Sequence, residues 1–342
     1  MVAPKLRFKE FDGDWTSKQL GKIIGISSAS RVFKEQWQDS GVPFFRTSDV
    51  VSIFKNKENE KAYISLELFE ELAKKSGKIK QGDLLVTGGG SIGIPYLVPN
   101  DQPLYFKDAD LLWMKSSGIV EGSFLYNFFI SPKFREYLKS ISHTGTISHF
   151  TIEQAKATPF GFPSKEEQTK IASFLSNVDE KISQLTQKLE LLSQYKQGMM
   201  QKLFSQQIRF KADDGSEFGE WEDKTIEQIA NFRRGSFPQP YGLPEWLDSN
   251  GFPFVQVYDV SDKMLLKERT KIKISQLAAD QSVFAKQGTL IITIQGSIGR
   301  IAKMQYDAYV DRTLLIFQSY NCEVDVDYFK YALFLVVYQK VC

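Results

Sequence analysis

The sequence predicts an α+β protein in which two repeated β-rich domains are joined by one long coiled-coil helix. Three observations predict it: short apolar runs bounded by turn residues, a repeat of those runs in the same order, and a heptad pattern between the copies. The 342 residues, 42% hydrophobic and 25% charged, suit two or three globular domains. We expect domains at residues 1–160 and 207–342, with the helix over residues 161–206.

Two glycine turns are the clearest part of the repeat. "GDLLVTGGGSIGIPYLV" begins at Gly82 and "GTLIITIQGSIGRIAKM" begins at Gly288. Trp15 and Trp221 show the same spacing as the serines of the two Gly-Ser-Ile-Gly turns. Two more pairs of blocks, "KLRF" with "QIRF" and "GVPFFRTSDV" with "GFPFVQVYDV", follow the same order at slightly different spacings. Four matched blocks indicate a duplicated domain.

Each copy shows the same order of expected elements. A Phe/Asp/Gly/Trp segment leads into a short helix, and a strand such as "VPFFRTSDV" or "FPFVQVYDV" follows a variable polar stretch. A charged segment comes next, and then two strands around the Gly-Ser-Ile-Gly turn. Short strands separated by turn residues predict a small sheet or a barrel-like domain.

The glycine turns could in principle bind phosphate. A Walker-type loop ends in Lys-Ser/Thr and leads directly into a helix. Neither turn contains Gly-Lys-Ser/Thr, and the following "IPYLV" and "RIAKM" are typical of strands. The glycines therefore favour tight strand-to-strand turns with positive φ, and a DNA-facing turn is the next alternative.

Between the copies, "SKEEQTKIASFLSNVDEKISQLTQKLELLSQYKQGMMQKLF" predicts a helix over residues 164–204, about 60 Å long at ~1.5 Å per residue. Ser164 and Glu167 match a capping box after Pro163. Steps of four and three residues form a narrow apolar stripe, which indicates a coiled-coil partner. This helix seam consists of Ile171, Leu175, Val178, Ile182, Leu185, Leu189, Leu192, Met199 and Leu203.

Composition excludes several classes of protein. Two cysteines cannot form a disulfide framework, and His143 and His149 have no cysteine near them, so we expect no metal site. The chain shows no signal peptide and no apolar run of the roughly 18 residues that a membrane helix needs, so we expect a cytoplasmic protein without a membrane contact. A net charge of +2 neither requires nor excludes a polyanionic partner.

The motifs resemble one family. "P-x-x-x-E-Q-x-K-I-A-x-F-L" from Pro163 to Leu175 and the closing "L-x-x-x-K-Q-G-M-M-Q-K-L-F", placed between two copies of a variable β-rich domain, are similar to the specificity subunit of type I DNA restriction-modification systems. The resemblance covers Leu6 to about Tyr331. It implies two target-recognition domains that each read one half of a bipartite DNA target, with two antiparallel helices as the spacer.

The resemblance also implies partners. In this family the helices dock DNA adenine-methyltransferase subunits, which carry S-adenosylmethionine, and restriction subunits that use ATP and Mg join that core. The specificity subunit itself has no cofactor and no catalytic residue. The residues agree, since the chain contains no Asn/Asp-Pro-Pro-Tyr/Phe motif. Two rival functions stay open: an enzyme acting on DNA or nucleotides through the glycine turns, and a coiled-coil scaffold with two protein-binding domains.

Candidate DNA contacts lie at matching places in the two copies but differ in side chain. Phosphate contacts need positive groups, and base edges are read by side chains such as Arg, Asn and Gln. The candidates in the first copy are Arg31, Lys34, Gln36, Arg46, Thr47, Ser48 and Ser91. The candidates in the second copy are Arg233, Arg234, Gln239, Tyr241, Gln256, Tyr258, Gln295, Ser297 and Arg300.

Alignment of the two copies places Cys342 opposite the "PKFREYLKS" segment of the first copy. The sequence therefore predicts that the second domain is C-terminally incomplete and that the second helix is missing. The helix seam would then lack an intramolecular partner, so we expect self-association through residues 164–204 or pairing with a separate fragment.

Overall fold

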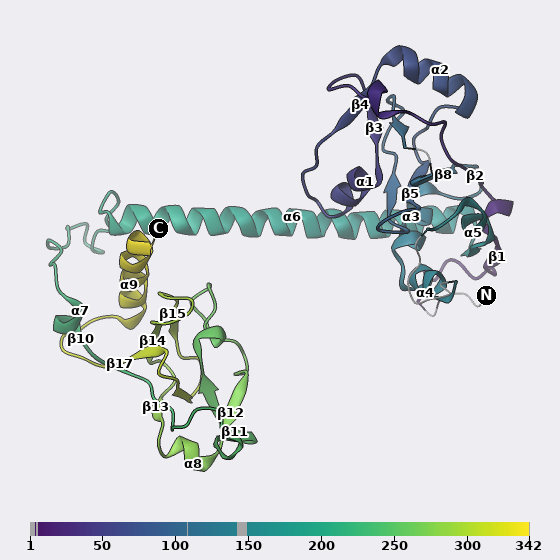
Figure 1. The fold of residues 1–342 in the computed structure, drawn as a ribbon. Coiled ribbons are helices and arrows are strands. Elements are labelled where there is room, and N and C mark those ends of the chain that lie inside the picture. The colour runs from purple at the N-terminus through teal and green to yellow at the C-terminus, as the bar shows by residue number, and fades with distance from the viewer. Residues whose placement is uncertain (1–3, 5, 108, 142–148, 342) are drawn as a thin grey trace. The chain divides into compact units, whose positions relative to one another are not determined.

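The computed structural model describes residues 4, 6–107, 109–141 and 149–341, and the chain divides into two compact units, Met1–Lys188 and Leu189–Cys342. Both units contain helices and sheets (Figure 1), which confirms the predicted α+β class. His143 and Cys342 lie outside the described residues. Within the described part, none of the helices combines the length and the hydropathy that a membrane crossing requires.

The first unit has a four-stranded sheet, a three-stranded sheet and a two-stranded ladder. Its elements are β1 (Thr16–Gln19), η1 (Leu20–Lys22), β2 (Gly25–Ser27), η2 (Lys34–Gln36), β3 (Val42–Phe45), α1 (Thr47–Phe54), β4 (Ala62–Ile64), α2 (Leu66–Ser76), β5 (Leu84–Thr87), β6 (Pro95–Leu97), β7 (Tyr105–Phe106), β8 (Leu111–Lys115), α3 (Gly122–Ile130), α4 (Pro132–Ser140), α5 (Ile152–Ala157), β9 (Pro159–Phe162) and the start of α6 (Lys165–Phe204).

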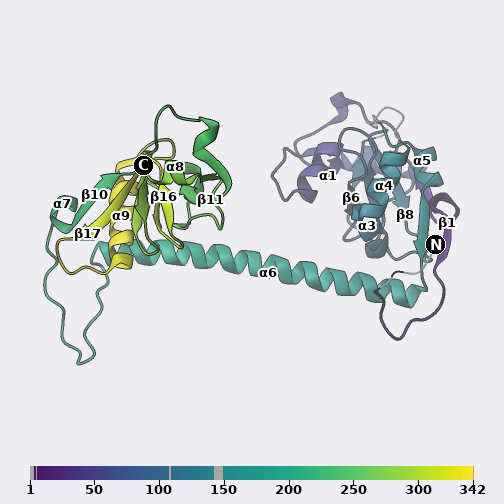
Figure 2. The same ribbon diagram turned by 90° about the horizontal axis from the view of Figure 1, so that it is seen from below.

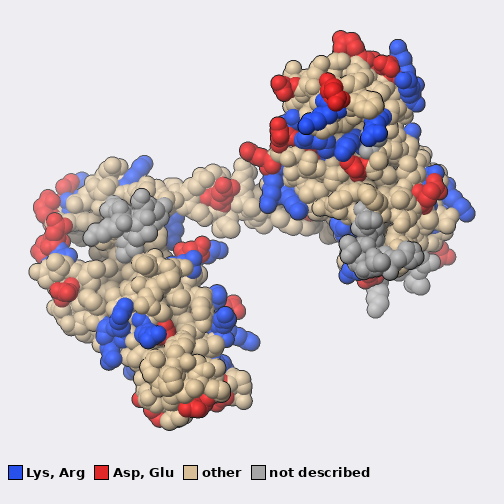
Figure 3. All heavy atoms as spheres, in the orientation of Figure 1, with Lys and Arg blue, Asp and Glu red and all other residues tan. Residues whose placement is uncertain are grey.

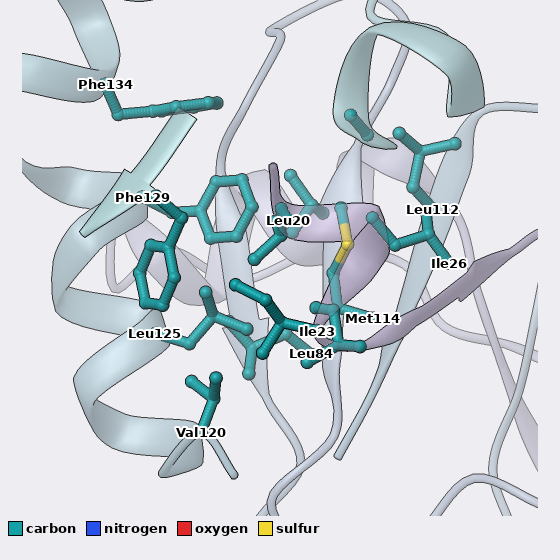
Figure 4. Packing of buried hydrophobic residues seen from close by; sticks show 14 of the residues in the cluster. Leu20, Ile23, Ile26, Leu84, Leu112, Met114, Val120, Leu125, Phe129 and Phe134 are labelled. Carbon is teal, nitrogen blue, oxygen red and sulfur yellow. The ribbon is translucent and has the colours of Figure 1, made fainter. Parts of the chain in front are cut away.

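In the four-stranded sheet of the first unit, in the order β2-β8-β5-β6, the central strands β8 and β5 are buried on both faces. Its apolar strands "LLVT" and "LLWMK" suit that environment, since alternate residues point to opposite sides. One side packs on α3 and α4, where Leu84, Leu112 and Met114 meet Leu125, Phe129 and Phe134 (Figure 4). Burial of this apolar surface, at about 25 cal/mol per Å², stabilises the unit.

The second unit also has two main sheets, each with four strands. Its elements are the end of α6, α7 (Ile226–Ile229), β10 (Ala230–Arg234), η3 (Pro244–Trp246), β11 (Leu247–Val255), η4 (Val257–Asp259), β12 (Ile272–Ile274), α8 (Gln276–Ala279), β13 (Val283–Ala285), β14 (Leu290–Thr293), β15 (Ile301–Lys303), β16 (Ala308–Val310), β17 (Leu314–Tyr320) and α9 (Val326–Val341).

Sheet topology confirms the duplication. The order β10-β17-β14-β15 corresponds strand by strand to β2-β8-β5-β6. In the other sheet of each unit, one parallel pair occurs at the same place: β3 with β7, and β11 with β16. Helix α9 follows β17 as α3 follows β8, and it covers its sheet through Phe329 and Leu333 (Figure 2).

Helix α6 begins and ends where the sequence predicts, but its start is held differently from the predicted capping box. Ser164 Oγ accepts a hydrogen bond from the Glu167 backbone N–H (3.3 Å). The Glu167 carboxylate, which is 1% exposed, instead accepts from Arg7 Nε (2.7 Å) and Nη2 (2.6 Å). The buried Gln168 amide donates to the carbonyls of Ile119 (3.1 Å) and Pro163 (3.0 Å). The Glu-Gln pair of the motif therefore anchors the helix to the first unit.

The helix seam has three regions. Ile171 packs on the core of the first unit, and Leu175 is half-buried. The seam residues Val178, Ile182, Leu185, Leu189 and Leu192 are 40–66% exposed. Met199 and Leu203 are half-buried in the second unit, where the neighbouring Phe204 stacks on Tyr328 (ring centroids 5.4 Å). The long helix is confirmed, and its pairing in a coiled coil stays a prediction.

Candidate nucleic-acid interface

The two glycine turns have the same hydrogen-bonded structure. Thr87 Oγ1 accepts from the Ile94 N–H (2.8 Å) and donates to the Ser91 carbonyl. In the second unit, Thr293 Oγ1 accepts from the Arg300 N–H (2.9 Å) and donates to the Ser297 carbonyl. Each turn joins two antiparallel strands, β5 to β6 and β14 to β15.

Positive φ angles explain the glycines in these turns. Gly90 and Gly93 have φ of 68° and 72°, and their counterparts Gly296 and Gly299 have 68° and 85°. Residues with a side chain rarely adopt this conformation. The predicted strand-to-strand turns are confirmed, and no helix follows either turn, as a Walker-type phosphate loop would require. The predicted DNA contacts Ser91, Gln295 and Ser297 are exposed on the turns, whereas Arg300 Nη1 donates to the Val260 carbonyl (3.2 Å).

In the first unit, Asp49 holds Arg46 at the start of α1, directly after β3. The Arg46 N–H donates to Asp49 Oδ2 (2.8 Å), and its side-chain Nε donates to the same oxygen (2.9 Å). Arg46 Nη2 also donates to the Glu60 carbonyl, and the guanidinium lies 5.6 Å from the Trp37 ring centroid. The hydrogen bonds to Asp49 raise the pKa of Arg46. This predicted base contact therefore has a structural role in the loop, and its contact with DNA stays a prediction.

The other predicted contacts of the first unit are in two places. Thr47 Oγ1 donates to the Asp110 carbonyl (3.4 Å), and Ser48 Oγ accepts from Asn59 (3.3 Å), so both lie beside Arg46 at the start of α1. The rest lie in η2 or shortly before it. Its Gln36 side chain accepts from the Phe33 N–H (2.9 Å). The remaining two, Arg31 and Lys34, are exposed.

The second unit brings three predicted contacts together. Gln256 occupies the place of Arg46, after β11, and its N–H donates to Asp259 Oδ2 (2.9 Å) as the Arg46 N–H does to Asp49. The Gln256 amide lies between the hydroxyls of Tyr241 and Tyr258, to which it is hydrogen-bonded on both sides. The other predictions, Arg233, Arg234 and Gln239, are exposed on β10 and the loop after it.

Sequence reasoning missed two cations and one carboxylate at this place. Arg312 lies over the Tyr241 ring (5.7 Å to the centroid), and Lys271 lies over the Tyr258 ring (4.8 Å). The buried Asp311 carboxylate accepts from Thr313 through Oδ1, and its Oδ2 has no hydrogen-bond partner in the described residues. These residues come from segments far from Gln256 in the chain, so no local pattern could have pointed to them.

Charge is distributed unevenly on each unit. Figure 3 shows groups of Lys and Arg side chains on the visible face of each unit, with Asp and Glu between them. Part of the lysine-rich segment after Leu72 is neutralised, because Lys75 pairs with Glu71 (3.2 Å) and Lys78 with Glu70 (2.8 Å). Within the described residues, Arg233, Arg234 and Arg312 form no salt bridge. These cations are available to an anionic partner.

Comparison with known proteins gives consistent matches. Residues 12–194 match the family model described as type I restriction modification DNA specificity domain. A putative type I restriction enzyme specificity subunit of Haemophilus influenzae is 29% identical over 175 residues, which are 51% of this chain and 42% of that protein. The MjaIX specificity subunit of Methanocaldococcus jannaschii is 27% identical over 271 residues, 73% of this chain and 60% of that protein. The chain thus covers less than two thirds of either relative.

Solved structures show the same fold. The S subunit of a type I restriction-modification system from M. genitalium has a TM-score of 0.55 and 18% identity, over 99% of this chain and 82% of that one. A chain from a structural study of assembly and conformational transition in the type I system has a TM-score of 0.50 and 16% identity, over 94% and 79%. At identities of 18% and 16%, these matches show a similar fold and nothing more.

Proposed function

Because the chain belongs to the family of type I restriction modification DNA specificity domains, we propose that it is a sequence-specific DNA-recognition subunit of a restriction-modification complex. Each unit reads one half of a bipartite duplex target. The chain is non-catalytic: it selects the sequence, and partner subunits carry out the chemistry on the DNA.

One observation carries this proposal. The two units share a backbone frame down to the hydrogen bonds of the glycine turns, yet they carry different side chains at equivalent positions. Arg46 and Ser48 in the first unit correspond to Gln256 and Tyr258 in the second. A duplicated frame with exchanged hydrogen-bonding groups fits two readers of different base sequences.

The partners in this proposal follow from the family. DNA adenine-methyltransferase subunits would bring S-adenosylmethionine, and restriction subunits would bring ATP and Mg. The exposed part of the helix seam, from Val178 to Leu192, supports a docking role, since an apolar stripe in water is unfavourable until a partner helix covers it. Self-association through the same stripe belongs to this proposal as an alternative use of that surface.

The rival functions have less support. A nucleotide or DNA-acting enzyme would use the glycine turns, but both turns are strand-to-strand turns whose Thr87 and Thr293 hydroxyls bond to the turn itself. A scaffold with two protein-binding domains has no support among the relatives, which are specificity subunits.

The test is a methylation map. We expect cells that express this chain with an adenine-methyltransferase subunit of the same family to gain methylation at one two-part motif with a fixed gap. Cells with the methyltransferase subunit alone are the control. Purified chain should also retain DNA duplexes more weakly as salt rises, because phosphate contacts release counterions. Absence of both new methylation and sequence-selective retention would refute the function.

A further inference from the structure

A large apolar groove lies open on the second unit. It has a volume of about 1090 Å³ and is lined by side chains from residues 198–207, 221–229 and 322–336, all within that unit. Two of its aromatic side chains, Trp221 and Tyr328, are 43% and 47% exposed. Large apolar side chains gathered in one exposed groove mark a binding site for another molecule.

The duplication of the two units shows what covers the same aromatic pair in the first unit. Trp221 and Tyr328 correspond to Trp15 and Phe124. Both pairs meet edge to face, with ring centroids 6.2 Å apart in the second unit and 5.9 Å apart in the first. Phe124 is only 7% exposed, whereas Tyr328 stays exposed although Phe204 stacks on it. The pair is therefore covered in one unit and open to water in the other.

In the first unit the cover is one continuous segment, which consists of β9 and the start of α6. Strand β9 pairs antiparallel with β1, and its Phe160 and Phe162 are buried in the core. Residues 222–225 occupy the place of β1 in the second unit, but among the described residues they pair with no strand. The backbone groups of residues 222–224 also make no backbone hydrogen bond there, so they can pair with an added strand.

An arginine beside the groove offers a matching charge. Arg209 corresponds to Arg7, since each donates through Nη2 to the carbonyl of the glycine at the same place in its turn. Arg7 also holds the Glu167 carboxylate through Nε and Nη2. Arg209 Nε has no hydrogen-bond partner in the described part of the chain, and its one ion pair, with Glu220, is 3.9 Å long. Arg209 can therefore bind a carboxylate as Arg7 does.

The start of α9 offers a second polar match. In the first unit, Gln168 Oε1 accepts from the Glu121 N–H at the start of α3 (2.9 Å). Asp325 corresponds to Glu121, because each side chain caps the helix that follows it. Within residues 149–341, no acceptor bonds to the Asp325 N–H. A glutamine next to the incoming glutamate would supply one.

We propose that the groove binds a segment of another polypeptide in which an aromatic strand leads into a helix with Glu-Gln in its first turn. The strand would pair with residues 222–225, the glutamate with Arg209 and the glutamine with the Asp325 N–H. Glu167 of this chain is 1% exposed in its own first unit, so the occupant is a second segment of the same chemistry. The inference concerns assembly and does not rest on the proposed function.

The experiment titrates the full chain with a labelled synthetic peptide that has the sequence of residues 158–175 and so carries this chemistry. Fluorescence anisotropy measures binding, and hydrogen–deuterium exchange shows where the peptide lies. We expect amides of residues 222–229 to exchange more slowly in the complex, because strand pairing protects them. A peptide of the same composition in scrambled order is the control.

Paired variants identify the contact. Arg209→Gln should weaken binding by about 10- to 100-fold, because a charge-assisted contact to the peptide carboxylate is lost. A peptide with Glu167→Gln should show a similar loss, and the two changes together should cost no more than either alone. Arg269→Gln is the matched control, since Arg269 is an exposed arginine of the same unit outside the groove, and it should keep full affinity. Thermal unfolding checks that each variant folds.

Three results would overturn the proposal. The first is exchange at residues 222–229 that does not change at about 1 mM peptide. The second is independent, additive losses from Arg209→Gln and the peptide change, which would mean that the two groups do not meet. The third is protection of the groove in the chain alone as its concentration rises, which would mean that a second copy fills it. The assay contains no DNA, so its result is separate from that of the methylation map.

Discussion

Replacement of Arg46 by alanine tests whether this side chain supports the fold of the first unit as well as any DNA contact. In the structure its Nε and Nη2 donate to the Asp49 carboxylate at 2.9 and 3.3 Å, and Nη2 also donates to the Glu60 carbonyl. Asp49 is only 7% exposed. Alanine removes these side-chain bonds. The buried Asp49 carboxylate then has no ion-pair partner and fewer hydrogen bonds to offset the cost of its burial.

The expected loss of stability depends on the hydrogen bonds that Asp49 keeps in the variant. The Arg46 backbone N–H and Asn59 Nδ2 still donate to it, each at 2.8 Å. Removal of one partner of a buried ion pair costs about 3–5 kcal/mol. The Arg46 side chain is 21% exposed and water can reach the space it leaves, so we expect about 2–3 kcal/mol.

Hydrogen–deuterium exchange of the full chain is the assay, because it reports opening of the first unit by itself. At about 1.4 kcal/mol for each factor of ten, amides of β3 and β4 should exchange about 30- to 150-fold faster in Arg46→Ala. Arg31→Ala is the matched control: Arg31 is exposed and lies 5.7 Å from the Phe33 ring, so its loss should change stability by less than about 0.5 kcal/mol. Equal exchange in the two variants would refute the structural role of Arg46.

Three further predictions concern other parts of the chain. Gly93→Ala should unfold the first unit more readily than Gly90→Ala, by about 1–3 kcal/mol, in urea titrations: both have positive φ, but only a Cβ at Gly93 would meet Phe134 Cε1, at 2.8 Å. Leu185→Glu with Leu189→Glu should leave the chain monomeric in light scattering where the wild type associates, and a monomeric wild type would count against the seam as an interface. Folding raises the pKa of Tyr241 from its ordinary value near 10 to about 12. The protonated phenol therefore contributes its full stability below pH 10, and this contribution is lost as the pH rises toward about 12. Tyr241→Phe should flatten the fall in unfolding free energy over that pH range.

Much of the fold could be predicted because its signals are local and repeated. The glycine turns need positive φ at fixed offsets from two apolar runs, and that pattern appears twice in the sequence. Helix α6 shows a heptad period over many residues, so even its ends at Lys165 and Phe204 lie close to the prediction. Signals of this kind depend on backbone conformation and burial, which the order of residues in one segment determines.

The candidate interface was less predictable because its contacts join distant segments. Tyr241, Gln256 and Tyr258 were named from their residue types, but the sequence does not show that one amide bonds to both hydroxyls. Arg312 and Lys271 reach the same cluster from separate segments. The role of Glu167 was misjudged for the same reason, since Arg7 lies at the opposite end of the first unit's sequence.

The carboxylates of Asp49 and Asp259 indicate how one backbone frame can carry different side chains. Asp49 and Asp259 occupy the same place, and each carboxylate accepts from the backbone N–H three residues earlier, at 2.8 and 2.9 Å. That bond fixes the backbone after β3 and β11. It uses only the backbone N–H of Arg46 or Gln256, so the side chain at that position can vary. Arginine can therefore stand at one such place and glutamine at the other while the frame is retained. If Arg46 contacts DNA, that contact and the stability of the first unit are coupled through Asp49, whereas the Gln256 amide bonds to Tyr241 and Tyr258 instead.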